Sequence, residues 1–161
     1  MADWPYLCLE IFKLRQVIAA YWLKDCEEIV EIGGYKVPMS EFVTQKITVI
    51  DPLVEARSDD RVTHLPITFQ NWSGSVPNNF GLVILGFDLI MELDHWKRLY
   101  GMINTCKAAV IETPIDYEPS IKQFSVLLNN TNKKISQQVL LDLSGNEITT
   151  KFVRRRMHLL V

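Results

Sequence analysis

The sequence predicts one α/β domain of three layers, with helices on both faces of a mostly parallel, seven-stranded sheet. Short apolar runs alternate with segments of helical periodicity along most of the chain, which is the pattern of strand and helix units. Two β-rich runs separated by a short turn then end this alternation. A length of 161 residues suits a single core, so we expect residues 1–161 to form one domain.

Composition argues against several classes of partner. The net charge is −2 and charged residues make up 22% of the chain, so the sequence has no basic footprint for nucleic acid. The first residues do not resemble a signal peptide and the apolar runs are too short to cross a bilayer, so we expect a cytoplasmic protein that does not enter the membrane. The three cysteines are widely spaced, at Cys8, Cys26 and Cys106, which supports neither a disulfide framework nor a metal site.

The first expected element is an amphipathic helix over residues 5–23. Asp3 is suitably placed to cap it, and Pro5 suits a first helical turn. Its apolar positions recur at spacings of three and four and are expected to face the sheet: Leu7, Ile11, Leu14, Ile18 and Trp22.

Five apolar or β-branched runs then predict parallel strands. They cover residues 28–32, 46–51, 61–69, 80–87 and 108–111. Pro66 lies within the third run and favours the edge of the sheet, because proline cannot donate to a ladder.

Three further helices are expected between these strands and after them. One is short and runs from Pro38 through Gln45, and the last opens at Pro119. The two longer helices have apolar stripes, at Leu93, Trp96, Tyr100 and Ile103 in one and at Ile121, Phe124 and Leu128 in the other.

The end of the chain predicts an antiparallel hairpin. A strand over residues 138–143 and another over residues 147–153 flank the turn Ser144-Gly145-Asn146. So short a turn can only join antiparallel strands, because a parallel return needs a crossover of a dozen or more residues. The basic run of Lys151 and Arg154-Arg155-Arg156 is most simply a protected edge or a solvated face.

Two links in the chain are too short for crossover helices. Residues 52–60 and 71–79 contain no convincing helical pattern. The sheet near the second and third strands would then lack cover, and a parallel sheet is normally buried on both faces. We therefore expect a homodimer or a partner protein on that surface.

Acidic residues and paired glycines follow two neighbouring strands. Glu31-Ile32-Gly33-Gly34 closes the first strand, and Asp51 closes the second. This is how open α/β sheets hold a nucleoside. The simpler reading is that Gly33-Gly34 forms a tight turn and Asp51-Pro52 opens another.

The order of elements resembles that of the class I S-adenosylmethionine-dependent methyltransferases, a Rossmann-like fold family. The resemblance implies that S-adenosylmethionine is the cofactor. It places Glu31, Gly33 and Gly34 beside the amino acid end of the cofactor and Asp51 at its ribose hydroxyls. The later glycines of the family's loop are replaced here by Tyr35-Lys36-Val37.

The same resemblance extends to the third and fourth strands. It implies that Asn71 and Trp72 meet the adenine and that Phe87 lies against the cofactor where the methyl group is transferred. Asp88 and His95 are then the candidates for catalytic acid or base, although His95 beside Asp94 also fits a solvated first turn of a helix. The implied activity is methyl transfer to an unknown small molecule.

Two other functions fit the sequence. The incomplete glycine loop and the missing helices also suit a catalytically inactive Rossmann-like module that binds a cofactor or a protein partner. A dinucleotide oxidoreductase fits less well, because G-x-G-x-x-G is absent and a terminal hairpin is atypical of that fold.

Overall fold

A computed structural model describes residues 10–86, 91–142 and 154–161. Its eight strands form one sheet in the order β3-β4-β2-β1-β5-β6-β8-β7. The strands are β1 (Glu28–Ile32), β2 (Lys46–Ile50), β3 (Arg57–Ser58), β4 (Val62–Leu65), β5 (Phe80–Ile84), β6 (Ala108–Pro114), β7 (Ile135–Asp142) and β8 (Arg154–Leu160). The helices are α1 (Leu14–Trp22), α2 (Leu93–Thr105) and α3 (Glu118–Asn129), with 3-10 helices η2 (Glu10–Lys13), η3 (Met39–Glu41) and η4 (Phe69–Asn71).

The sheet has a parallel centre and antiparallel edges. Strands β4, β2, β1, β5 and β6 are parallel, whereas β3 and β8 run the other way. Strand β7 is antiparallel to β8 and therefore runs in the same direction as the parallel strands. Strands β2, β3 and β4 lie on one side of β1 in the sheet, and the next strand in the sequence, β5, lies on the other side of β1. This reversal between β1 and β5 is the switch point at which open α/β sheets bind ligands.

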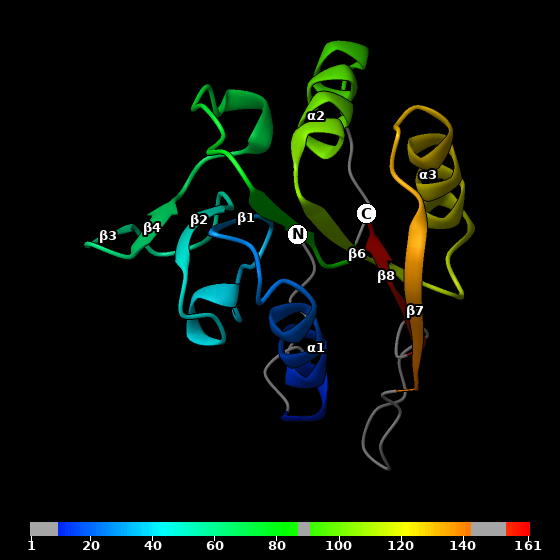
Figure 1. Ribbon diagram of the computed structural model, residues 1–161, viewed down its shortest axis with the longest axis horizontal. Helices are drawn as coiled ribbons and strands as arrows, with labels where there is room; N and C mark the ends of the chain where they lie inside the picture. Colours follow the sequence, from blue (N-terminus) through cyan, green and yellow to red (C-terminus); the bar gives the residue numbers. More distant parts are fainter. Residues whose placement is uncertain (1–9, 87–90, 143–153) are drawn as a thin grey trace.

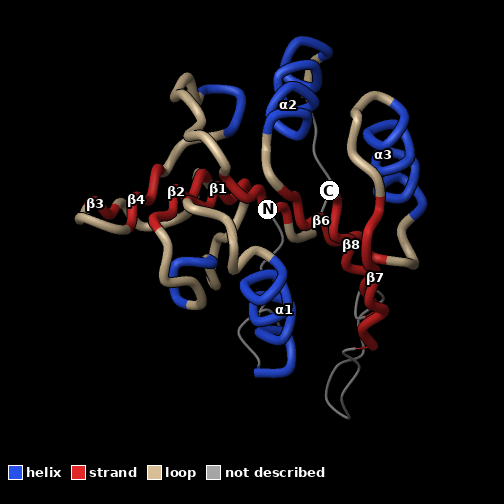
Figure 2. The backbone as a smooth tube through the Cα atoms, viewed as in Figure 1, coloured by secondary structure: helices blue, strands red, loops and turns tan. Residues whose placement is uncertain are grey.

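Helices cover both faces of the sheet. Figure 1 and Figure 2 show α1 on one side and α2 and α3 on the other. Two buried apolar clusters match these layers, one containing Ala19 and Leu23 near α1 and the other containing Leu99 of α2 and Phe124 of α3. The predicted three-layer α/β fold is confirmed. None of the described helices is long and apolar enough to cross a membrane.

All five predicted parallel strands are present. β1 has the predicted bounds, and β4 ends at Leu65, immediately before Pro66. The two longer helices also form where predicted, and Pro119 stands in the first turn of α3. β3 was not predicted; it is only two residues long and raises the number of strands from seven to eight.

The predicted C-terminal antiparallel hairpin is confirmed, and the strand that pairs with β7 is Arg154–Leu160. A turn at residues 144–146 would place Asp142 opposite Ile148, but Asp142 pairs with Arg154. The second strand of the described pair is thus β8, and it lies between β6 and β7 instead of at an edge. The proposed turn and residues 147–153 lie outside the described residues.

Two expectations about side chains and one about a helix were also wrong. The inward face of α1 carries Arg15, Gln16 and Ala19, while Leu14 is 43% exposed. In α3, Ile121 is 41% exposed and Leu127 is buried in its place. The helix expected over residues 38–45 is only the single turn η3.

The sheet near β2 and β4 is covered without α-helices. No α-helix forms between Ile32 and Phe80, a stretch described throughout. Met39 of η3 packs on one face, and Phe69 and Trp72 around η4 pack on the other, with exposures of 0%, 4% and 7%. The links are therefore short as predicted, but the expectation of a bare sheet was wrong.

Candidate cofactor site

Two glycines shape the turn at the carboxyl end of β1. Gly33 and Gly34 have φ angles of +93° and +113°, which other residues adopt only with strain. The Gly33 N–H donates to the carbonyl of Ile50 at 2.9 Å. This bond holds the turn against the end of β2, directly before Asp51.

The two glycines have different surroundings. A Cβ atom at Gly33 would meet no atom within 4 Å, so the backbone there borders open space. A Cβ atom at Gly34 would lie 2.9 Å from Cδ of Glu31 and 3.2 Å from Cγ1 of Val49. A ligand therefore has room to approach the backbone at Gly33, whereas the space beside Gly34 belongs to Glu31.

Glu31 is turned inward under the loop. It is 1% exposed, and its Oε2 accepts a 2.6 Å hydrogen bond from the backbone N–H of Met39. Burial raises the pKa of Glu31 to about 8; the nearby charge of Asp51 adds to this, while the Met39 N–H and Arg15 oppose it. In the described structure this carboxyl group secures the connection between β1 and β2.

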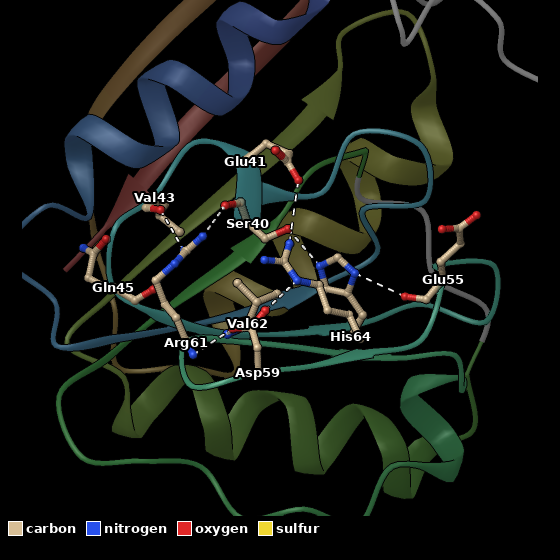
Figure 3. Close-up of polar contacts among 10 residues, drawn as sticks. Ser40, Glu41, Val43, Gln45, Glu55, Asp59, Arg61, Val62 and His64 are labelled. Atoms are coloured by element: carbon tan, nitrogen blue, oxygen red, sulfur yellow. Dashed lines mark hydrogen bonds and ion pairs between the residues drawn. The ribbon is translucent and has the colours of Figure 1, made fainter.

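Side chains of β4 and its neighbours fasten the rest of this connection. Figure 3 shows Arg61 donating to the carbonyls of Ser40, Val43 and Gln45 at 3.1, 2.9 and 3.3 Å. His64, 8% exposed, shares a 2.8 Å hydrogen bond with the Ser40 hydroxyl. The loop that replaces a crossover helix is thus tied to β4 by hydrogen bonds.

Asp51 opens a turn at the end of β2. Its Oδ1 accepts a 2.8 Å hydrogen bond from the N–H of Leu53, and its carbonyl accepts one from Val54. The residue is 9% exposed. A carboxylate has two oxygens and about four lone-pair sites, so this turn leaves it further acceptor capacity. The turn-opening interpretation of Asp51 is confirmed, and it is compatible with ligand binding.

The structure places Trp72 in the core under α2. Its ring centroid lies 6.2 Å from that of Phe69, and it is 7% exposed. It borders a pocket of about 430 Å³ that Gly33 and Asp51 do not line. The lining residues are Trp72, Gly74, Ser75, Val76, Arg98, Gly101, Met102 and Thr105. Asn71 is exposed in η4, and its N–H bonds to Thr68.

The predicted catalytic positions lie beyond β5. Phe87 and Asp88 are outside the described residues. His95 is half-buried in the first turn of α2, and its backbone N–H donates to the carbonyl of Glu92. Its Nδ1 atom is buried and has no hydrogen-bond partner in the described part of the chain.

A buried charge network on the α1 side of the sheet was not foreseen. Glu112 of β6 is 0% exposed and binds Arg15 of α1 at 2.7 Å and Arg155 of β8 at 2.9 Å. Burial alone would raise the pKa of Glu112, but the two guanidinium groups outweigh it and hold the pKa below its usual value. The expectation that Arg155 lies on an edge or a solvated face was wrong.

One signal for this network was present in the sequence. Glu112 closes an apolar run as Glu31 does, and a carboxylate at that position of a buried strand needs a partner. The network reaches the end of β5, because a Cβ atom at Gly86 would lie 3.9 Å from Nη1 of Arg155. Nothing in the spacing around Arg15 identifies it as that partner.

No protein-family model and no curated protein matches the sequence, but solved structures do match the fold. The N-methyltransferase NodS from Bradyrhizobium japonicum WM9, in complex with S-adenosyl-L-homocysteine, aligns with a TM-score of 0.66 at 10% identity over 98% of this chain and 90% of its own. The 1,6-didemethyltoxoflavin-N1-methyltransferase of Burkholderia thailandensis, with S-adenosylhomocysteine bound, gives 0.65 at 10% identity, over 97% and 80%.

A third match covers nearly all of both chains. It is an rRNA methylase from Streptococcus thermophilus, with a TM-score of 0.55 at 10% identity over 99% of this chain and 97% of that one. At such identities the likeness concerns the fold. Together with the strand order, it shows that the protein has the class I S-adenosylmethionine-dependent methyltransferase-like fold.

Proposed function

We propose that the protein binds S-adenosylmethionine at the carboxyl ends of β1 and β2 and transfers its methyl group to a small molecule. The observation that carries this proposal is the open space beside Gly33, at the switch point of the sheet, in a turn that is hydrogen-bonded to the end of β2 directly before Asp51. Neighbours in fold that were crystallised with S-adenosylhomocysteine support it.

The residues at this edge fit such a ligand in distinct roles. The backbone at Gly33 would lie against the amino acid end of the cofactor, because no side chain blocks its approach. The carboxylate of Asp51 would accept hydrogen bonds from the ribose hydroxyls while Oδ1 keeps its bond to Leu53. Glu31 would act indirectly, by holding the loop through Met39.

The cofactor would supply an activated methyl group, so the chain mainly has to align the acceptor with it. A base is needed only for an acceptor that must lose a proton. Asp88 and His95 remain the proposed groups for that task, and the buried Nδ1 of His95 is available for a hydrogen bond among the described residues.

A second candidate function is a non-catalytic module of the same fold. The inward turn of Glu31 favours it, because that carboxyl group is engaged with the chain itself. The core position of Trp72 also favours it, since a ring packed under α2 is committed to the protein interior.

Calorimetric titration with S-adenosylmethionine and S-adenosylhomocysteine tests the proposal. Asp51→Asn keeps an oxygen for the Leu53 turn but removes the charge, so we expect binding to weaken at least about tenfold. Asp59→Asn is the matched control, because Asp59 also caps a turn, through the N–H groups of Arg61 and Val62. We expect it to bind as the parent does.

Absence of binding by the parent protein would refute the cofactor site. Equal loss in Asp51→Asn and Asp59→Asn would show that the loss reflects the fold and not the site. If binding is confirmed, transfer of a labelled methyl group to a metabolite extract separates the enzyme from the non-catalytic module.

A further inference from the structure

The two edges of the sheet differ in their protection. At one end, β3 is only two residues long, and its Arg57 forms ion pairs with Asp59 and Glu41 at 2.7 and 3.9 Å. The other end of the sheet is β7 (Figure 1). This strand has eight residues and no charged side chain from Ile135 to Leu141. Short, charged edges resist pairing with other chains, whereas long, uncharged ones invite it.

The hydrogen-bond pattern shows which backbone groups of β7 point away from β8. The N–H of Ile115 donates to the carbonyl of Arg154, so the backbone groups of Arg154 point to β6. Neighbouring residues of a strand point alternately to either side, so those of Arg155 point to β7 and meet Leu141. The N–H and C=O groups of Gln138 and Leu140 therefore point away from β8.

Side chains of β7 present apolar groups on both faces. Leu141 belongs to the buried cluster on the α1 side, and Val139 packs against the same cluster. Leu140 points to the opposite face and is 58% exposed. An added strand would thus meet apolar neighbours on either side of the sheet.

We propose that β7 pairs with β7 of a second copy of this chain, antiparallel and centred on Leu140, so that two sheets become one. In this register the two Leu140 side chains lie opposite each other across a two-fold axis. Val139 of each copy meets Leu141 of the other, and Gln138 meets Asp142.

The side chains of β7 around Leu140 are complementary to a second copy of themselves, which identifies a second copy of this chain as the partner of the β7 edge. The three central positions pair apolar with apolar side chains, and an isologous interface requires such matching. Centring the pair on Val139 would place Gln138 opposite Leu140, and centring it on Gln138 would place Gln137 opposite Val139. The hydrophobic pattern therefore specifies one register. This inference does not depend on the proposed cofactor site.

A proline substitution tests the backbone pairing. Leu140→Pro removes an N–H that points away from β8, so it spares the ladder of the subunit. Leu140→Thr removes the same side chain but keeps that N–H. By sedimentation velocity from about 1 to about 100 μM, we expect the parent and Leu140→Thr to dimerise and Leu140→Pro to remain monomeric.

Two results would overturn the proposal: a monomeric parent at the highest concentration, or equal dimerisation of both variants. Disulfide trapping covers the case in which Leu140→Pro fails to fold. Cys26 and Cys106 are buried, so trapping is done in a Cys8→Ser background. Opposed hydrogen-bonded residues lie about 5.5 Å apart between Cα atoms, which is within the range that a disulfide spans.

Leu140→Cys should therefore form a covalent dimer under mild oxidation. Gln138→Cys is the matched control, because its copy in the second subunit would lie four strand positions away, roughly 13 Å along the strand. Trapping of both variants to the same extent, or of neither, would contradict the register.

Discussion

The carboxyl group of Glu31 occupies the space in which a side chain at Gly34 would lie, with Cδ 2.9 Å from the position of a Cβ atom there. The acidic residue and the glycine that follows it three positions later are thus a steric pair. The acid needs the glycine in order to turn inward and reach the N–H of Met39. Sequence motifs of this kind can therefore record packing within the loop as well as contact with a ligand.

This relationship predicts unequal effects of alanine at the two glycines. Gly33→Ala should destabilise the protein by about 1 to 2 kcal/mol, because only its positive φ is unfavourable. Gly34→Ala should cost a further 1 to 3 kcal/mol or so, because it also displaces Glu31. Urea unfolding of both variants measures the difference. In a Glu31→Ala background most of the extra cost should disappear, because only the 3.2 Å contact with Cγ1 of Val49 remains. An undiminished extra cost would contradict the steric pairing.

The raised pKa of Glu31 predicts a loss of stability as the pH rises from about 4.5 to about 8. The folded pKa of about 8 lies above the ordinary value of 4.5, so between these values the folded state binds a proton that the unfolded state has released. The contribution of Glu31 to the free energy of unfolding therefore falls as pH rises from about 4.5 to about 8. Glu31→Gln keeps an acceptor for Met39 without titrating. Unfolding curves of the parent and this variant should converge at low pH and diverge towards pH 8.

His158 predicts the opposite slope at acidic pH. It stacks on Phe124 with ring centroids 4.0 Å apart and bonds to Thr113 and Gln138 at 3.2 and 2.9 Å. Burial, with the charge of Arg156, lowers its pKa from 6.5 to about 4. The unfolded state then binds more protons between these values, so stability from this group is lost as pH falls from about 6.5 to about 4.

The variant His158→Gln isolates this effect. Its free energy of unfolding, subtracted from that of the parent at each pH, should give a difference that changes only within the acidic window. A difference that is constant with pH would mean that the imidazole of His158 has the same pKa in the folded and the unfolded state. The windows of Glu31 and His158 overlap, so the parent curve alone would not separate them.

The buried network around Glu112 predicts a large cost for neutralising one charge. Glu112→Gln removes the negative charge that both Arg15 and Arg155 contact, at a site where all three residues are at most 6% exposed. A destabilisation of about 3 to 5 kcal/mol is expected. Asp116→Asn removes the exposed ion pair with Arg154, which neighbours Arg155 on β8. This substitution should cost no more than about 1 kcal/mol. Chemical denaturation of both variants compares the two pairs.

The sequence predicted the parts of this fold that local patterns specify. Apolar runs located the five parallel strands, and helical periodicity with Pro119 located α2 and α3. The pairing of Asp142 with Arg154 was missed, because hairpin register depends on residues opposite each other and not on the run itself. The exposed side of α1 was misjudged for a related reason, since Arg15 turns inward to meet a carboxylate 97 positions away.

The sequence located the candidate site residues along the strands but did not predict the contacts of their side chains. Gly33 and Asp51 come close after the ends of the neighbouring strands β1 and β2, because parallel strands end at a common edge. The inward turn of Glu31 and the core position of Trp72 could not be read from spacing, because both follow from the lack of crossover helices. Side chains next to the shortened links fill the volume that those helices would have occupied.

The network of Arg15, Glu112 and Arg155 also bears on how the chain folds. Its members come from α1, β6 and β8, and its two ion pairs close loops of 97 and 43 residues. An intermediate that docked α1 on the early strands alone would bury the Arg15 charge with no anion from Glu112. Such partly assembled states are penalised, so both halves of the sheet should form in one cooperative transition, at a rate limited by long-range contacts.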